Sequence, residues 1–160
     1  MTFMNFRFFV ALIFTLALTI LPLPELLVGL RPPWVLLIIL YTQFFLAENF
    51  NLALLIFIGM ALDVLLSTVL GEHVFALAIV VWIASSKARR FRLFSMGQQM
   101  ALIGFFCLLY QSLILIIDAS LGYYYGFIMP LGSTLISILL WPWVRLLADE
   151  SLAPKAAYRS

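Results

Sequence analysis

The chain has 160 residues, of which 66% are hydrophobic and only 10% are charged, and its mean hydropathy is +1.17. Water-soluble domains average about 45–50% apolar and about 25% charged residues, so this composition excludes a soluble globular fold and predicts a membrane protein. The formal net charge of +2 is too small to indicate nucleic acid as a partner.

Six apolar stretches follow one another along the chain, and each is interpreted as a transmembrane helix. They cover residues 3–21, 34–46, 51–66, 74–86, 98–117 and 127–147. The first resembles a signal peptide, but no small-x-small cleavage motif follows it, so we expect an uncleaved helix. We predict an all-α integral membrane protein, a single domain over residues 1–160 with six transmembrane helices in one bundle and a short cytoplasmic tail over residues 148–160.

Basic residues and tryptophans predict the orientation of the bundle. With the N-terminus in the cytoplasm, eight of the nine Lys and Arg residues lie in inner segments and only Arg31 lies in an outer loop, so both termini are expected to be cytoplasmic. Trp34 then falls at the outer membrane interface, while Trp82, Trp141 and Trp143 fall at the inner one. The loop between the fourth and fifth helices contains Lys87, Arg89, Arg90 and Arg92. We interpret it as a topological anchor that also binds anionic lipid headgroups, with a partner-docking surface as the alternative.

Few residues with catalytic or metal-binding potential are present. His73, the only histidine, follows Glu72 in a predicted outer loop, where both side chains are expected to be solvated. There is no glycine-rich phosphate loop and no pair of embedded acids on one helix. We therefore expect no enzyme and no catalytic, metal or cofactor site. Cys107 is the single cysteine, which excludes a disulfide framework within the chain, and we expect it to be a buried, inert thiol.

Asp63 is the clearest polar residue inside an apolar stretch. Gly59, Asp63 and Ser67 are four residues apart and share one helical face, which allows close approach and offers hydrogen bonds. An ionisable residue at mid-bilayer costs about 2.5–3.5 kcal/mol, so Asp63 should face protein or a water-filled cavity. Alternatively, it lies near the outer helix end and is simply hydrated. We expect Arg31 to approach Asp63 and to close the outer ends of the second and third helices.

Polar residues on the last two helices suggest further packing contacts. Gln111 and Asp118 are seven residues apart on one face, with Asp118 at the outer end, which indicates a polar outer half of the bundle. Ser133, Ser137 and Trp141 follow at four-residue spacing and predict a small-residue seam. We favour intramolecular packing for this seam over a partner interface.

Three stretches resemble the bacterial rod shape-determining protein MreD family: LRPPWVLLIILY (30–41), GMALDVLLSTVLGEHVFA (59–76) and LLWPWVRLL (139–147). Their order and spacing fit, as do the total length and the hydropathy. The resemblance runs from about residue 30 to residue 147, and the first helix matches only in hydrophobicity.

The first two stretches carry the more specific motifs, an Arg-Pro-x-Trp start of the second helix and a Gly-x-x-x-Asp followed eight residues later by glycine. Family members often have glycine where Ser67 stands, so the third helix here is expected to end later or more tightly. The candidates for structural or partner contacts are Arg31, Trp34, Gly59, Asp63, Gly71, Asp118, Trp141, Pro142 and Trp143.

The resemblance implies a non-enzymatic scaffold or regulatory subunit of the cell-elongation complex, which makes peptidoglycan at the bacterial inner membrane. The implied partners are the bitopic protein MreC, the MreB filament, the glycosyltransferase RodA and a class B penicillin-binding transpeptidase. The family is also distantly similar to substrate-binding subunits of vitamin transporters, so small-molecule uptake is the alternative function. That alternative is less favoured, because Ala11 and Ala17 are six residues apart and do not form an Ala-x-x-x-Ala coupling seam.

Overall fold

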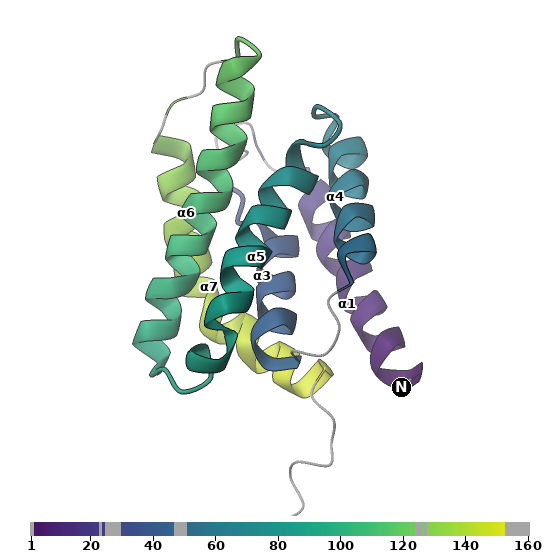
Figure 1. Ribbon diagram of the computed structural model, residues 1–160, viewed down its shortest axis with the longest axis vertical. Coiled ribbons are helices and arrows are strands. Elements are labelled where there is room, and N and C mark those ends of the chain that lie inside the picture. The colour runs from purple at the N-terminus through teal and green to yellow at the C-terminus, as the bar shows by residue number, and fades with distance from the viewer. Residues whose placement is uncertain are drawn as a thin grey trace, which may run out of the picture.

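The computed structural model describes residues 2–22, 24, 30–46, 51–123, 126 and 128–152, and all regular structure in them is helical (Figure 1). The helices are α1 (Thr2–Ile20), α3 (Trp34–Tyr41), α4 (Leu52–Leu66), α5 (Glu72–Phe91), α6 (Met96–Ser120) and α7 (Ile128–Leu152). A π-helical turn, η1 (Thr42–Leu46), continues α3. The predicted all-α fold is confirmed for the described residues.

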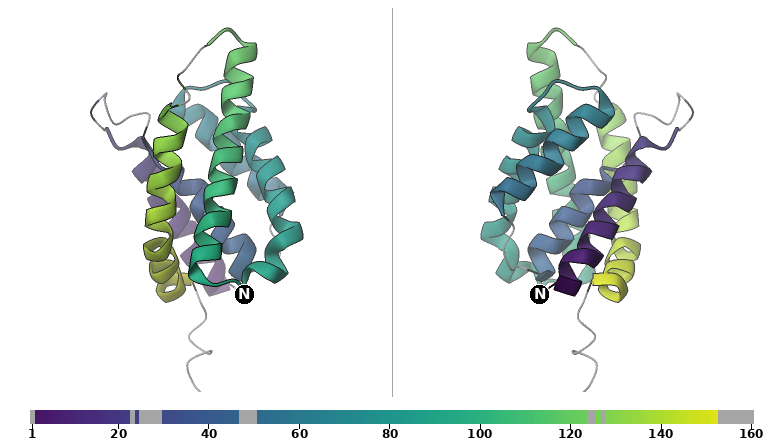
Figure 2. Two further views of the ribbon diagram at one scale, coloured as in Figure 1. Left: turned by 90° about the vertical axis from the view of Figure 1, so that its left-hand side faces the viewer. Right: turned by 90° about the vertical axis from the view of Figure 1, so that its right-hand side faces the viewer.

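Helix α3 lies at the centre of the bundle, and every residue from Val35 to Tyr41 is buried. It packs against α1 and α7 and also touches α5 and α6, while α4 packs on α5 and α6 packs on α7 (Figure 2). A helix that is apolar on all sides can be surrounded by other helices without burying an unpaired polar side chain. The uniformly hydrophobic sequence of α3 is therefore compatible with its central place.

Helices α5, α6 and α7 all extend beyond their predicted ends, α5 and α7 by the most. Helix α5 runs to Phe91, so Lys87, Arg89 and Arg90 lie in its last turns and only Arg92 belongs to the following turn. Helix α7 runs through Pro142 to Leu152, so the tail predicted from residue 148 is helical up to that point. Lys and Arg are good helix formers and are favoured near helix C-termini. Hydropathy marks where a chain becomes polar, but helical hydrogen bonding need not stop there.

Of the described helices, α6 and α7 are long and apolar enough to cross a membrane, judged by length and composition alone. Residues 6–20 of α1, the continuous α3–η1 segment and α4 form shorter apolar helices. Large apolar side chains are exposed on the outer faces of several helices, among them Phe14 (64%), Phe57 (69%) and Leu139 (69%). Such faces suit lipid or another transmembrane helix better than water.

Polar contacts join the helices at the end of the bundle where α1 begins and α7 ends, here called the proximal end (bottom of Figure 1). The Tyr41 hydroxyl donates to Asp149 Oδ1 at 2.5 Å, and Arg145 Nη1 donates to Gln99 Oε1 at 2.9 Å. Arg92 Nε donates to a backbone carbonyl of η1 at 2.6 Å. These bonds tie α3 and η1 to α6, α7 and the α5–α6 turn.

Trp141 and Trp143 differ in their surroundings, although both were expected at the inner membrane interface. Trp143 is exposed, as is Trp82 on α5. Trp141 is fully buried instead, and its ring meets that of Phe91 edge to face at 6.0 Å. Residues two apart on a helix point in different directions, so one tryptophan fills the core while the other lies on the surface.

Helix α4 meets α5 backbone to backbone at Gly59. A Cβ atom on Gly59 would lie 2.6 Å from Val74 Cα and 2.8 Å from Val74 N, closer than such atoms can approach. The absence of a side chain thus allows the two helices to touch. The predicted role of Gly59 in close helix approach is confirmed.

Ser67 ends α4 in a left-handed backbone conformation, with φ 54°. Non-glycine residues pay about 1–2 kcal/mol for this conformation because Cβ crowds the carbonyl oxygen. We expect Ser67→Gly to stabilise the protein by about 1 kcal/mol, which would raise the thermal midpoint in detergent by about 2–4 °C. The same change at exposed Ser85, inside α5, should lower stability by about 0.5 kcal/mol. Equal effects of the two substitutions would contradict the conclusion that the backbone of Ser67 is strained.

Candidate functional site

Asp63, near the end of α4, has a buried carboxylate that accepts several hydrogen bonds from the start of α5. Its Oδ2 accepts from the backbone N–H of Gly71 at 2.6 Å, and its Oδ1 accepts from the backbone N–H of His73 at 2.9 Å. The ring nitrogen Nδ1 of His73 lies 2.8 Å from the same Oδ1. The Thr68 hydroxyl adds a longer contact to Oδ1 at 3.4 Å.

This arrangement caps α5 with a side chain from the preceding helix. The first N–H groups of a helix lack partners inside it and attract negative charge. The residue at the N-cap position of α5, Gly71, has no side chain to fill that role, and Asp63 fills it instead. Gly71 has φ 98°, a left-handed conformation that glycine adopts without strain. The carboxylate and the glycine together fix the α4–α5 turn.

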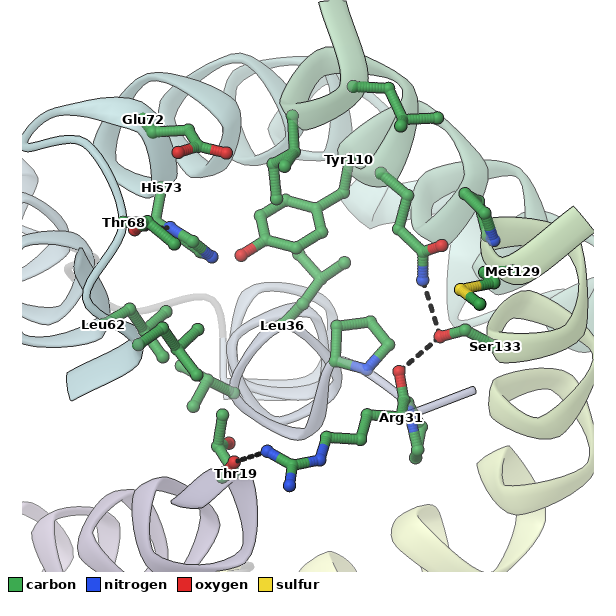
Figure 3. Close-up of a pocket in the computed structure, with 18 of the residues that line it drawn as sticks. Thr19, Arg31, Leu36, Leu62, Thr68, Glu72, His73, Tyr110, Met129 and Ser133 are labelled. Carbon is green, nitrogen blue, oxygen red and sulfur yellow. Dashed lines mark hydrogen bonds between the residues drawn. The ribbon is translucent and has the colours of Figure 1, made fainter. Parts of the chain in front are cut away.

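Arg31 does not meet Asp63, so the predicted contact between them is wrong. Arg31 Nη1 donates to the Thr19 carbonyl at 2.8 Å (Figure 3). Its Nη2 donates to the Leu21 carbonyl at 2.5 Å. The guanidinium therefore satisfies backbone carbonyls at the end of α1, a position that favours a cation. Each charged side chain thus binds groups of a neighbouring segment of the chain. Arg31 binds carbonyls at the end of α1, and Asp63 binds N–H groups at the start of α5.

His73 and Glu72 are buried, contrary to the expectation that both are solvated. Their exposed fractions are 5% and 3%, and both belong to the first turn of α5 rather than to a loop. The His73 ring lies between the Asp63 carboxylate and the ring of Tyr110 on α6, whose centroid is 6.1 Å away. Asp63 is buried as well, which rules out the alternative that it is merely hydrated.

A cavity of about 590 Å³ lies at the end of the bundle opposite the proximal end, here called the distal end. All six described helices, α1 by way of Thr19, and the segment before α3 supply its walls. Figure 3 shows side chains from these elements facing a common space. Its lining polar residues include Arg31, Thr68, Glu72, His73, Tyr110, Gln111, Asp118 and Ser133. Its apolar residues include Leu36, Leu62, Ile114, Leu115 and Met129.

Hydrogen bonds hold one side of this cavity together. Gln111 Nε2 donates to Ser133 Oγ at 2.6 Å, and the Ser133 hydroxyl donates to the backbone carbonyl of Arg31. These bonds join α6, α7 and the segment before α3. Ser133, Ser137 and Trp141 are all buried within the bundle, which agrees with an intramolecular seam. Cys107 is also buried, as expected.

The structure separates the predicted site residues into two groups. Arg31, Trp34 and Asp118 line the cavity, and Asp63 and Gly71 form the turn beside it. Gly59 lies in the contact between α4 and α5. The remaining candidates are on the proximal half of α7 (Trp141, Pro142 and Trp143) or at the end of α5 and in the following turn, where the basic residues are exposed (Lys87, Arg89, Arg90 and Arg92). Sequence reasoning missed Thr68, Glu72, His73 and Tyr110. The sequence does contain a pattern that points to Thr68, Glu72 and His73. An acid near a helix end is followed by a glycine eight residues later and by a histidine ten residues later.

The family model of the rod shape-determining protein MreD matches residues 1–150. The chain belongs to the MreD family. The MreD protein of Haemophilus influenzae is 27% identical over 118 residues, which are 74% of this chain and 73% of that relative. No solved structure matched the chain, so the likeness to vitamin-transporter subunits stays a prediction. The predicted family is confirmed, and the match includes α1, beyond the residues from which the resemblance was first recognised.

MreD family membership implies a role in rod-shape determination, and the family is not a known enzyme family. MreD proteins are membrane proteins, with which the apolar helices α6 and α7 agree. Two of the three MreD-like stretches, residues 30–41 and 59–76, meet at the distal end and line the cavity there. The third, residues 139–147, lies in α7 and leads toward the proximal end.

Proposed function

We propose that this MreD protein is a non-enzymatic scaffold or regulatory subunit of the cell-elongation complex in the bacterial inner membrane. Its direct partner is a bitopic MreC-like protein, and MreB, RodA and a class B penicillin-binding transpeptidase are further components. The family match carries the proposal, because membership implies rod-shape determination. The mode of action is the positioning of partners that build peptidoglycan.

In this proposal six helices cross the membrane, and both termini are cytoplasmic. The exposed basic residues Lys87, Arg89, Arg90 and Arg92 belong to the end of α5 and the turn after it, and Figure 1 shows that turn at the proximal end. Arg31 lies at the distal end. An excess of basic residues on one side supports placing the proximal end in the cytoplasm. The cavity then opens on the outer side of the bilayer.

Helices α1 and α4 form the side of the bundle on which a partner helix is proposed to pack. They lie on the same side of the molecule (Figure 2). Helix α4 packs against α5 through one face and presents an apolar face away from it, which contains Ile56, Phe57, Met60 and Val64. Helices associate in lipid through close packing of such faces and modest hydrogen bonds. A bitopic protein has a single transmembrane helix, which can pack on such a face.

Co-purification with a bitopic MreC-like protein tests the proposal. The detergent-solubilised chain should retain such a partner, and Phe57→Ala should weaken retention at least about fivefold, because truncating a central aromatic contact costs more than about 1 kcal/mol. Phe105→Ala is the matched control, since Phe105 is exposed on α6 on the other side of the bundle. No retention by the wild-type chain would overturn the scaffold proposal. If both variants weakened retention of the partner equally, the partner would not pack on the α4 face that contains Phe57.

A further inference from the structure

Glu72 has a buried carboxyl group that pairs with no basic side chain in the described residues. Its side chain lines the distal cavity, the residue is 3% exposed, and neither carboxylate oxygen has a hydrogen-bond partner within the described parts of the chain. Figure 3 shows both oxygens on the side of α5 that faces Tyr110 and the cavity. Native structures rarely leave a buried polar group without a hydrogen-bond partner, so an unpaired group needs an explanation, such as a molecule that binds beside it.

The groups around Glu72 do not supply that partner. Asp118 also lines the cavity, is half-buried and makes no side-chain hydrogen bond or ion pair with any described residue, so it is a second acidic group without a partner there. The two lining residues that can carry positive charge are engaged elsewhere: the His73 ring with Asp63, and the Nη atoms of Arg31 with carbonyls of α1. Two acidic groups that face the cavity without a basic partner indicate a cationic ligand.

The other lining residues limit what that cation can be. Groups of three or more His, Cys, Asp or Glu side chains able to hold a metal ion are absent from the described residues. A volume of about 590 Å³ lies within the range of about 300–1,000 Å³ that is typical for small organic ligands. Leu36, Ile114 and Met129 supply apolar wall next to the carboxylates. The site therefore suits an organic molecule that has a charged end and an apolar or neutral remainder.

We propose that the distal cavity of this MreD protein binds a molecule with a primary ammonium group, which donates hydrogen bonds to Glu72 while Asp118 adds a second negative charge. An ammonium group has three donors, which suit carboxylate oxygens that lack partners. Arg31 also lines the cavity, and its Nε has no hydrogen-bond acceptor in the described structure. It can donate to a polar oxygen of the same molecule. The ammonium can belong to an aminophospholipid headgroup or to a free water-soluble amine. This site is additional to the scaffold role and does not depend on it.

The test uses the full chain in lipid nanodiscs. Discs of phosphatidylcholine alone are compared with discs that also contain phosphatidylethanolamine, and ethanolamine is titrated into the former. The readouts are the thermal midpoint and the number of retained lipids by native mass spectrometry. A saturable stabilisation by phosphatidylethanolamine alone identifies the lipid as the source of the ammonium. Stabilisation by ethanolamine as well identifies a site open to free amines. No response to either probe overturns the proposal.

Glu72→Gln keeps the size of the side chain but removes its charge, and it should weaken the response at least about tenfold, as expected for loss of a hydrogen bond to a charged group. The variant should fold, because glutamine has the same size as glutamate and no described residue bonds to the Glu72 carboxyl group. Glu150→Gln, on an exposed residue near the proximal end of α7, should keep the wild-type response. A folded E72Q protein with wild-type affinity overturns the proposal. If E72Q cannot be purified, Asp118→Asn takes its place, and an unchanged affinity there overturns the proposal equally.

Discussion

Asp63→Asn should lower the free energy of unfolding by about 3 kcal/mol, because it removes the charged acceptor that joins α4 to α5. The carboxylate receives the backbone N–H groups of Gly71 and His73 on separate oxygens, and the His73 ring lies 2.8 Å from one of them. An asparagine has only one acceptor oxygen, so at least one of these buried donors would face an amide NH₂ group. Unfolding in mixed micelles, followed by circular dichroism, measures the loss.

Asp118→Asn is the matched control for this change. Asp118 lies toward the same end of the bundle, but it is only half-buried and its side chain bonds to no described residue. Its substitution should alter the free energy of unfolding by less than about 0.5 kcal/mol. If Asp118→Asn lowered the free energy of unfolding as much as Asp63→Asn does, then any acidic residue at the distal end would contribute to stability. The capping of α5 by Asp63 would not be the cause.

Gly59→Ala should destabilise the protein by about 1–3 kcal/mol, the usual range for overpacking a closely packed contact. The added Cβ would lie 2.6 Å from Val74 Cα and 2.8 Å from Val74 N, which are backbone atoms that cannot rotate away. Helix α4 would have to move away from α5, and the hydrogen bonds of Asp63 would lengthen as a result. The thermal midpoint in detergent measures the effect.

Two further variants test the geometry of this contact. Gly97→Ala, in the first turn of α6, meets nothing within 4 Å and should leave stability unchanged or raise it by up to about 1 kcal/mol. Val74→Ala, combined with Gly59→Ala, removes the Val74 methyl groups but keeps the backbone atoms, so it should not rescue the protein. A full rescue would show that the side chain of Val74, and not the backbone, sets the distance between the helices.

The α4–α5 turn links the stability of the fold to the cavity. Thr68, Glu72 and His73 line the cavity and lie within or directly beside the turn that Asp63 and Gly71 hold. Loosening the turn should therefore move one wall of the cavity as well. Because an acid in lipid is expensive unless it is paired, burying Asp63 against α5 also explains how an apolar helix accommodates it.

Much of the helical layout could be predicted from the sequence, but the helix ends and the pairing of polar groups could not. The predicted ranges 34–46 and 51–66 agree with α3–η1 and α4, because apolar length is a strong signal. Helices α5 and α7 end later than hydropathy predicts, because helical hydrogen bonding continues into polar residues. Arg31 and Asp63 lie at the same end of the bundle but do not pair, because hydropathy does not show which donor lies closest to an acceptor.

The sequence by itself determined that the fold is helical, that most of the chain is hydrophobic, that it belongs with MreD, and that Gly59 and Asp63 share a face. These properties depend on composition and on residue spacing along one helix. Only the tertiary structure decided that Asp63 caps α5 through Gly71 and His73, that Arg31 turns to α1, and that Glu72 lies unpaired beside a cavity. The physical reason is that a hydrogen bond forms only within about 3 Å, a distance that the packing of several helices sets together.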